Sequence, residues 1–201
     1  MRSHPAHLLR PMLSATAAVL LALPGCSGPK TQPVQEAKPL PVDLRLEAGP
    51  RINPDPRGNP LSVVVRTYQL KVLDEFSKLT FDRASSDRPA AELLGQEVVS
   101  TSEFTVVPGA TAIRTESLKP EAQYLAIVAL FRQPDPQFWR VVIAAKDLRP
   151  APVQESKGFF SRKSETPAPA KGKSATIKVQ ENAIALEGLA YVALPGQPTS
   201  R

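Results

Sequence analysis

A single cysteine, Cys26, closes an apolar run near the start of the chain and constrains what can follow it. The run extends from Met12 to Leu23, Arg2 and Arg10 precede it, and small Gly25 comes just before the cysteine. A basic start, a short apolar middle and a small residue before the cleavage point are typical of a secretory signal peptide. The run is too short for a membrane-spanning helix, which needs roughly 20 apolar residues.

The order Leu23-Pro24-Gly25-Cys26 fits the bacterial lipobox, an apolar residue three positions before a cysteine. It predicts cleavage before Cys26, transfer of diacylglycerol to the sulfur and N-acylation of the new terminus. Cys26 is the only cysteine and has no partner for an internal disulfide. Each buried methylene contributes about 0.8 kcal/mol, so two or three acyl chains anchor a protein stably. The alternative is an ordinary cleavage site with an incidental thiol.

We therefore interpret residues 1–25 as a lipoprotein signal peptide and residues 26–40 as a flexible tether. The tether is polar and rich in proline, and it lacks apolar periodicity. Residues 27–41 span at most about 50 Å when fully extended and about 20 Å in a typical coil. A domain that begins near residue 41 is thus expected to stay close to its membrane.

The basic charge of the chain comes from one segment. The formal net charge is +6, and loss of Arg2 and Arg10 with the signal peptide leaves +4. Residues 146–173 contain seven basic and three acidic residues, which accounts for this whole excess. Because the rest of the mature chain is neutral, the sequence argues against a nucleic-acid-binding domain.

About eight short apolar segments with tight turns between them predict an antiparallel β-sandwich over residues 41–194. Alternating polarity predicts half-buried strands at both ends of this range. Two segments are apolar on both faces, and one of them, 124–131, is expected to be a central strand covered on both sides. A later segment places Trp139, Val141 and Ile143 on one face. The predicted strands are 41–47, 61–70, 97–107, 110–118, 124–131, 138–144, 175–181 and 184–186.

A helical insert is expected at about 74–95, where apolar residues such as Phe76 and Leu79 lie among charged residues and alanines. Asp87-Arg88-Pro89 is typical of a helix start, with Asp87 as the N-cap and proline in the first turn. We expect one or two short helices that end near Gly95.

Two further segments are expected to be irregular. Residues 147–174 are basic, rich in proline and serine, and aperiodic apart from Phe159-Phe160, which predicts a disordered loop. The alternative is contact with anionic lipid or a partner, steered by the basic residues and completed by the two aromatic rings. Residues 195–201 are predicted to form a disordered tail.

The predicted mature chain contains no histidine, and an enzyme would need a pair of carboxylates whose geometry the sequence does not show. The only histidines, His4 and His7, leave with the signal peptide, and Cys26 is expected to be acylated. A zinc site of His and Cys is therefore excluded, and no glycine-rich phosphate loop is present. Asp74-Glu75 and Asp135 are interpreted as a solvated helix start and a turn residue. We predict that the protein is not an enzyme and has no small-molecule substrate or cofactor beyond the covalent lipid.

One loop stands out by its composition. Residues 49–60 contain four prolines, two glycines and two asparagines, which predicts an ordered but irregular connection. Prolines reduce the entropy that a loop loses when it binds, and arginine and asparagine side chains offer directional donors. From these residues alone, a plain stiff connection and a binding loop are equally favoured.

Several of these features together resemble a known family. The lipobox, the proline-rich tether, the loop Asn53–Pro60 and the Val-Arg-x-Tyr-Gln-Leu run within 63–70 are similar to the TssJ (SciN, VasD) family. These are outer-membrane lipoproteins of the type VI secretion membrane complex. The resemblance covers about 42–146 and 175–187 and includes the Pro108-Gly109 turn. Residues 150–173 depart from it as an insertion.

The resemblance implies a transthyretin-like sandwich of two sheets with an extra helical piece. It implies lipid attachment to the outer membrane of a Gram-negative bacterium, facing the periplasm. It also implies binding to the periplasmic C-terminal domain of a TssM-like inner-membrane protein through the loop between the first two strands. In this chain the candidate partner-binding residues are Arg51, Ile52, Asn53, Pro54, Asp55, Pro56, Arg57 and Asn59.

The leading hypothesis is therefore a structural lipoprotein that anchors and recruits the TssM-like protein. The alternative is a periplasm-facing lipoprotein that binds a small hydrophobic or glycan ligand. A pocket between the two sheets would favour the alternative.

Overall fold

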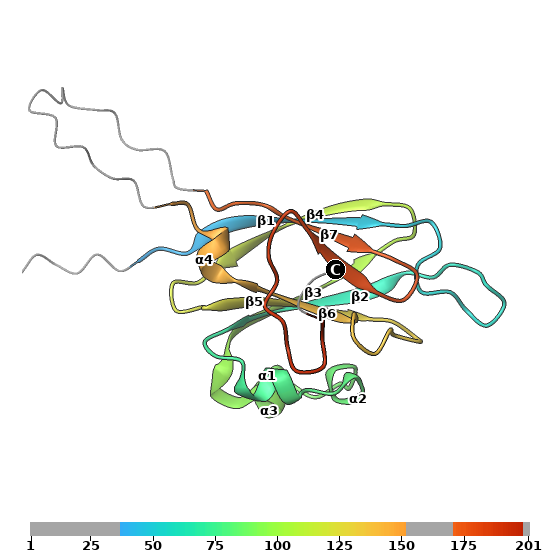
Figure 1. The fold of residues 1–201 in the computed structure, drawn as a ribbon, viewed down its shortest axis with the longest axis horizontal. Helices are drawn as coiled ribbons and strands as arrows, with labels where there is room; N and C mark the ends of the chain where they lie inside the picture. Colours follow the sequence, from blue (N-terminus) through green and yellow to red (C-terminus); the bar gives the residue numbers. More distant parts are fainter. Residues whose placement is uncertain (1–36, 152–170, 199–201) are drawn as a thin grey trace, which may run out of the picture. The chain divides into compact units, whose positions relative to one another are not determined.

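In the computed structural model the described residues, 37–151 and 171–198, form eight strands in two four-stranded sheets (Figure 1). The first sheet has the order β4-β1-β7-β8 and the second β3-β2-β5-β6. This confirms the predicted mainly-β sandwich with a short helical insertion. The strands are β1 (Leu40–Ala48), β2 (Val63–Leu70), β3 (Val98–Val106), β4 (Thr111–Leu118), β5 (Tyr124–Leu130), β6 (Arg140–Ala144), β7 (Ala175–Val179) and β8 (Ile184–Glu187).

One strand pair departs from the predicted antiparallel pattern. β1 and β7 are parallel, with Leu44 opposite Ala175 and Ala48 opposite Val179. β1 and β7 are not consecutive, and the strands β2 to β6 lie between them in the chain, so the long connection that a parallel pair requires is present. β7 is reached from β6 through the stretch 145–174. That stretch begins with α4 (Ala145–Leu148), so the irregular segment predicted from residue 147 starts later than expected.

The strands run between two ends of the sandwich, which we call the loop end and the entry end. At the loop end lie the connections β1–β2, β3–β4, β5–β6 and β7–β8, which follows from the strand order and pairing. At the entry end lie the start of β1, the beginning of the β2–β3 connection, the β4–β5 connection and α4 (Figure 1). β1 alone separates the ends by about 26 Å, at roughly 3.3 Å per residue.

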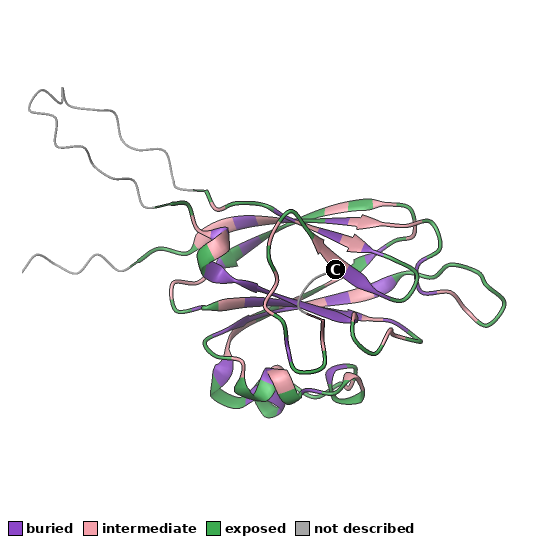
Figure 2. Ribbon diagram, in the orientation of Figure 1, coloured by how far each residue is buried: buried purple, intermediate pink, exposed green. Residues whose placement is uncertain are grey.

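The main core lies between the two sheets. Alternate residues of β1, such as Leu44 and Leu46, face alternate residues of β5, such as Leu125 and Ile127, and all four are fully buried. At about 25 cal/mol per Å² of apolar surface, this burial is the main stabilising contribution to the fold. Figure 2 shows β5 and β6 almost entirely buried along their length.

A second core explains why β5 is buried on both faces, as its sequence predicts. Its outward residues Ala126 and Val128 pack with Tyr68 and Leu70 of β2 beneath a helical cover. The cover consists of α1 (Asp74–Lys78), α2 (Phe81–Ala84), α3 (Ala90–Leu94) and the 3-10 helix η1 (Gly95–Glu97), more helices than the predicted one or two. The predicted Asp87 N-cap is wrong, because α3 begins two residues later, with Pro89 as its N-cap.

Two buried charges hold α1, a helix too short to form in isolation. At its N-terminus the Glu97 carboxylate accepts hydrogen bonds from the backbone N–H of Glu75 at 2.6 Å and of Phe76 at 3.1 Å. At its C-terminus the Arg140 guanidinium donates to carbonyl oxygens, including Phe76 at 2.7 Å and Leu79 at 2.8 Å. Each charge therefore meets the helix end whose dipole it complements.

Arg140 is 7% exposed, and its guanidinium lies 4.6 Å from the centre of the Trp139 ring. Burial lowers the pKa of Arg140 to about 10, which still leaves it charged at neutral pH. Trp139 itself is a core residue, as predicted, but it packs under the helices, whereas Val141 and Ile143 face the other sheet. The prediction that Trp139, Val141 and Ile143 share one face is wrong, because Trp139 lies before the strand, which begins at Arg140.

A carboxylate, Glu116, points inward from the edge strand β4 and is 9% exposed. It accepts hydrogen bonds from the hydroxyls of Thr67 at 3.0 Å and Ser102 at 2.5 Å. Its neighbour on the opposite face, Ile113, is 58% exposed. Inward-pointing charges on edge strands oppose unwanted pairing with other strands. This accounts for a charged side chain facing inward and an apolar one facing solvent on β4.

The chain after β8 crosses the open edges of both sheets. The Val192 N–H donates to the Val142 carbonyl at 2.7 Å, and the Gln197 side chain donates to the Arg140 carbonyl at 3.0 Å. Leu194 is 4% exposed. The predicted disordered tail is therefore wrong for its described part, 195–198, because hydrogen bonds fix this part against the sandwich.

Candidate functional site

The candidate partner-binding loop, residues 49–60, is fixed at its base by backbone hydrogen bonds. The Gly49 N–H donates to the Val179 carbonyl, and the Gly109 N–H donates to the Gly49 carbonyl, each at 2.9 Å. The Leu61 N–H closes the other side by donating to the Ile52 carbonyl at 3.2 Å. The loop is thus continuous with both sheets at the loop end.

Asn53 ties the loop to two neighbouring connections. Its Oδ1 accepts from the Arg132 N–H at 2.7 Å, its Nδ2 donates to the Ser62 carbonyl at 2.8 Å, and its own N–H donates to the Glu181 carbonyl at 2.7 Å. Asn53 is 6% exposed and has φ = 48°. Asparagine tolerates this left-handed conformation better than other residues with a side chain, so backbone and side chain select it together.

Asp55 organises the tip of the loop. Its Oδ1 accepts from the N–H of Arg57 at 2.8 Å and of Asn59 at 2.9 Å, while its Oδ2 accepts from the Asn59 amide at 3.0 Å. These bonds from Asn59, with a smaller contribution from Arg57, lower the pKa of Asp55. The tip therefore has one closed shape, built by local side-chain contacts of the kind that asparagine and aspartate make in turns.

The structure divides the eight candidate residues into three groups by their exposure. Ile52 and Asn53 are buried and cannot touch a partner without rearrangement. Pro54 and Asp55 are half-buried. The side chains that the loop presents to solvent are those of Arg51, Pro56, Arg57 and Asn59.

Residues of the neighbouring β5–β6 connection join this surface, although the sequence did not identify them as binding residues. Arg132 is exposed, and its guanidinium lies 3.4 Å from the Pro54 carbonyl oxygen. Asp135 accepts from the N–H of Gln137 at 2.9 Å and of Phe138 at 3.1 Å, a turn like that of Asp55. The usable signal was the Asp-Pro pair, which occurs in both loops, at Asp55 and at Asp135.

Two large apolar side chains are exposed beside the loop. Leu61, directly after the loop, is 39% exposed, and Val107, in the β3–β4 connection, is 54% exposed. Together with Arg51, Arg57 and Arg132 they give the loop end both apolar contacts and directional donors. Protein interfaces combine such features.

The predicted lipidation site, Cys26, lies outside the described residues, as do Phe159 and Phe160. In the described part of the chain no helix is long and apolar enough to cross a membrane. Within the same residues no three His, Cys, Asp or Glu side chains lie together as metal ligands would.

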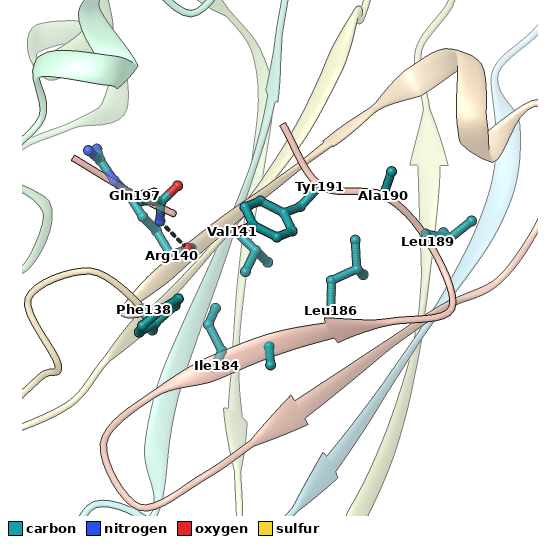
Figure 3. A pocket seen from close by; sticks show the side chains of 10 residues that line it. Phe138, Arg140, Val141, Ile184, Leu186, Leu189, Ala190, Tyr191 and Gln197 are labelled. Carbon is teal, nitrogen blue, oxygen red and sulfur yellow. Dashed lines mark hydrogen bonds between the residues drawn. The ribbon is translucent and has the colours of Figure 1, made fainter. Parts of the chain in front are cut away.

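A pocket of about 290 Å³ lies where the edges of the two sheets meet the C-terminal segment (Figure 3). Val141 of β6, Ile184 and Leu186 of β8, and Tyr191 of the C-terminal segment line it. The Gln197 side chain, bonded to the Arg140 carbonyl, closes one side. The lining is mainly apolar, and the volume lies at the small end of the range for ligand pockets.

Fold and site together define a small β-sandwich that presents a stiff, solvent-exposed loop end. Comparison with known families specifies the class. The family model T6SS-SciN, described as the type VI secretion lipoprotein family of VasD, EvfM and TssJ, matches residues 40–182. The chain belongs to this family of type VI secretion lipoproteins.

Solved structures agree with the fold. The structure titled "T6SS protein TssM C-terminal domain (869-1107) from EAEC" contains a chain with 25% identity and a TM-score of 0.54, covering 74% of this chain and 98% of that one. TssJ1 of Pseudomonas aeruginosa is 22% identical, with a TM-score of 0.55, and the match covers 78% of this chain and 99% of TssJ1. Serratia marcescens Lip is 19% identical, with a TM-score of 0.58, and the match covers 74% of this chain and 96% of Lip. No curated protein matches the chain.

Proposed function

We propose that this protein is the outer-membrane lipoprotein that anchors a type VI secretion membrane complex and recruits the periplasmic C-terminal domain of a TssM-like inner-membrane protein. The family supplies the setting. Chains of similar fold occur in structures titled for the TssM C-terminal domain and for a type VI membrane complex. The role is structural, and no catalytic step is assigned to it.

The observation that carries the proposal is the fixed geometry of the loop end. Asn53 and Asp55 hold the loop through hydrogen bonds of 2.7–3.0 Å, so little conformational entropy remains to be lost on binding. The exposed Arg51 and Arg57 are long side chains on a stiff base. A partner that offers carboxylates and an apolar patch fits this surface.

The anchor is assigned to Cys26, from which a diacylglycerol and an N-acyl chain would hold the protein in the outer membrane, facing the periplasm. Replacement Cys26→Ala is expected to release the protein into the soluble periplasmic fraction and to abolish secretion. Cell fractionation and a secretion assay measure the two effects. Normal secretion by this variant would contradict the anchoring role.

The recruiting role is tested by replacing the exposed residues Arg51, Pro56 and Arg57 with Gly or Ser, which leaves the buried Ile52 and Asn53 in place. Titration calorimetry with the periplasmic domain of the TssM-like protein from the same organism should show an affinity loss of roughly tenfold or more. A thermal melt is the control, because loss of the fold would also lower the affinity. Unchanged affinity with an unchanged melt would place the interface elsewhere.

The pocket of about 290 Å³ beside β6 and β8 favours a second candidate, binding of a small hydrophobic ligand. Its apolar lining by Val141, Ile184 and Leu186 suits an alkyl or aromatic group better than a glycan, since sugars require more polar partners. Native mass spectrometry of the protein from its host should show the added mass if such a ligand is carried. Replacement Leu186→Gln should remove that mass.

A further inference from the structure

The entry end of the sandwich carries an excess of positive charge. Six basic residues lie in its connections, against the acidic residues Asp74, Glu121 and Asp147, while Glu75 pairs with Lys78. Hydrogen bonds bring these connections together: the Lys173 N–H donates to the Leu148 carbonyl at 2.8 Å, and Arg149 donates to the Pro120 carbonyl at 2.9 Å. The six basic residues are Lys38, Lys71, Lys119, Lys146, Arg149 and Lys173.

Little of this charge is neutralised within the protein. Lys171 pairs with Asp43 at 2.7 Å, but the six residues above form no salt bridge with the described residues. The Arg149 guanidinium donates only to neutral carbonyl groups, those of Lys119, Pro120 and Ala122. Six basic against three acidic residues therefore give the entry end a net charge of +3.

The loop end provides the comparison. Its connections, residues 49–62, 107–110, 131–139 and 180–183, contain three basic and three acidic residues. That end is therefore neutral, and the described domain is electrically polar along the direction of its strands. A uniform excess of surface lysine would not give this distribution.

An apolar element accompanies the charge. Lys38 and Arg149 line a hollow of about 360 Å³ together with Leu40 and Leu118. Val72, which follows β2 at the same end, is 47% exposed. Basic side chains around exposed apolar groups are typical of surfaces that lie against anionic lipid headgroups.

We propose that the entry end docks on the anionic phospholipid headgroups of the bilayer and so holds the loop end pointing away from the membrane. The approach to the bilayer rests on the proposed anchor at Cys26, 14 residues before Leu40 in the sequence. Attraction acts over about one Debye length, about 10 Å at 0.1 M salt. The neutral loop end would then lie about 26 Å farther out, free for its partner.

The test uses the mature chain, residues 26–201, with Cys26→Ser, so that no acyl chain contributes to binding. Its partition is measured on phosphatidylcholine vesicles and on vesicles in which about a third of the lipid is phosphatidylglycerol. We expect binding to the anionic vesicles only, weakening as salt shortens the Debye length to about 3 Å at 1 M. Equal partition on both vesicle types would overturn the proposal.

Matched variants locate the surface. The triple variant Lys119→Glu, Lys146→Glu and Lys173→Glu should lower the partition coefficient by roughly a hundredfold or more, at about fivefold for each lysine lost. The control, with the same change of charge at the loop end, is Arg51→Glu, Arg57→Glu and Arg132→Glu, which should bind almost as the parent does. Equal losses in both variants would show a response to net charge and would overturn the proposal.

Two further measurements keep the result interpretable. If the Lys→Glu variant does not fold by circular dichroism, the triple Lys→Gln variant replaces it, with an expected loss of roughly a hundredfold. The mass of the N-terminal peptide from the host reports separately whether Cys26 is lipidated. A failed anchor and a failed docking surface therefore give different results.

Discussion

The loop end and the entry end of the sandwich differ both in how they are held and in their charge. At the loop end, the side chains of Asn53 and Asp55 fix one long connection against its neighbours, and the charges balance. At the entry end, Arg149 holds the β4–β5 connection through carbonyl groups, and lysines remain unpaired among the described residues. The first arrangement suits selective contact with a protein, and the second suits a charged surface without a fixed pattern.

The middle of the molecule supplies stability to both ends. The helical cover rests on Arg140, which donates to three backbone carbonyls of α1 and its C-cap region. If the ends carry recognition and the middle carries stability, changes at Arg140 should alter unfolding without altering either binding surface. That separation can be tested experimentally.

Replacement Arg140→Met should lower the free energy of unfolding by about 3–5 kcal/mol, because buried carbonyl groups lose a charged donor. Chemical denaturation measures the loss, and Arg140→Lys, which keeps the charge, should cost about half as much. Partner affinity per folded molecule should not change. A loss below about 1 kcal/mol would show that solvent replaces the guanidinium and that the clamp contributes little.

Replacement Asn53→Ala should cost about 2–3 kcal/mol in unfolding free energy. The change leaves the Arg132 N–H and the Ser62 carbonyl without their partner and puts alanine at φ = 48°. Unlike the Arg140 variant, it should also weaken partner binding, because the loop loses its fixed shape. Asn53→Gly is the control for backbone strain. Retained partner affinity in both variants would argue against preorganisation of the loop.

Acidification should loosen the tip of the loop without unfolding the sandwich. Hydrogen bonds from Asn59 lower the pKa of Asp55, so its contribution is present above the pKa of the unfolded chain and is lost as pH falls through the lowered value. The ordinary pKa of aspartate is about 3.9. An NMR titration of the Asn59 amide should therefore show a midpoint below that value. A midpoint at or above that value would contradict the hydrogen-bonded tip. Asp55→Asn should abolish the transition.

The sequence predicted the features that depend on local pattern. The apolar character of 124–131 on both faces predicted a strand covered on both sides, and β5 is buried in this way. The Pro108-Gly109 turn and the helical insert were also located correctly. Periodicity and turn residues act over a few positions, so one chain segment carries enough information for these assignments.

The features that were missed depend on residues distant in the chain. Nothing near Asn53 in the sequence shows that its amide will meet the Arg132 N–H, 79 positions away, so its burial could not be predicted. The clamp of Glu97 and Arg140 on α1 is equally non-local, spanning 64 positions for Arg140 and Phe76. Asp87 failed as an N-cap because Pro89 occupies that position.

One measurement tests the division of roles between the two ends most directly. Titration calorimetry with the periplasmic domain of the TssM-like protein should be performed on both triple variants, Arg51→Glu, Arg57→Glu and Arg132→Glu at the loop end and Lys119→Glu, Lys146→Glu and Lys173→Glu at the entry end. We expect roughly a tenfold or greater loss of affinity for the loop-end variant and parental affinity for the entry-end variant. Parental affinity in the loop-end variant, or loss only in the entry-end variant, would contradict the assignment of partner binding to the loop end.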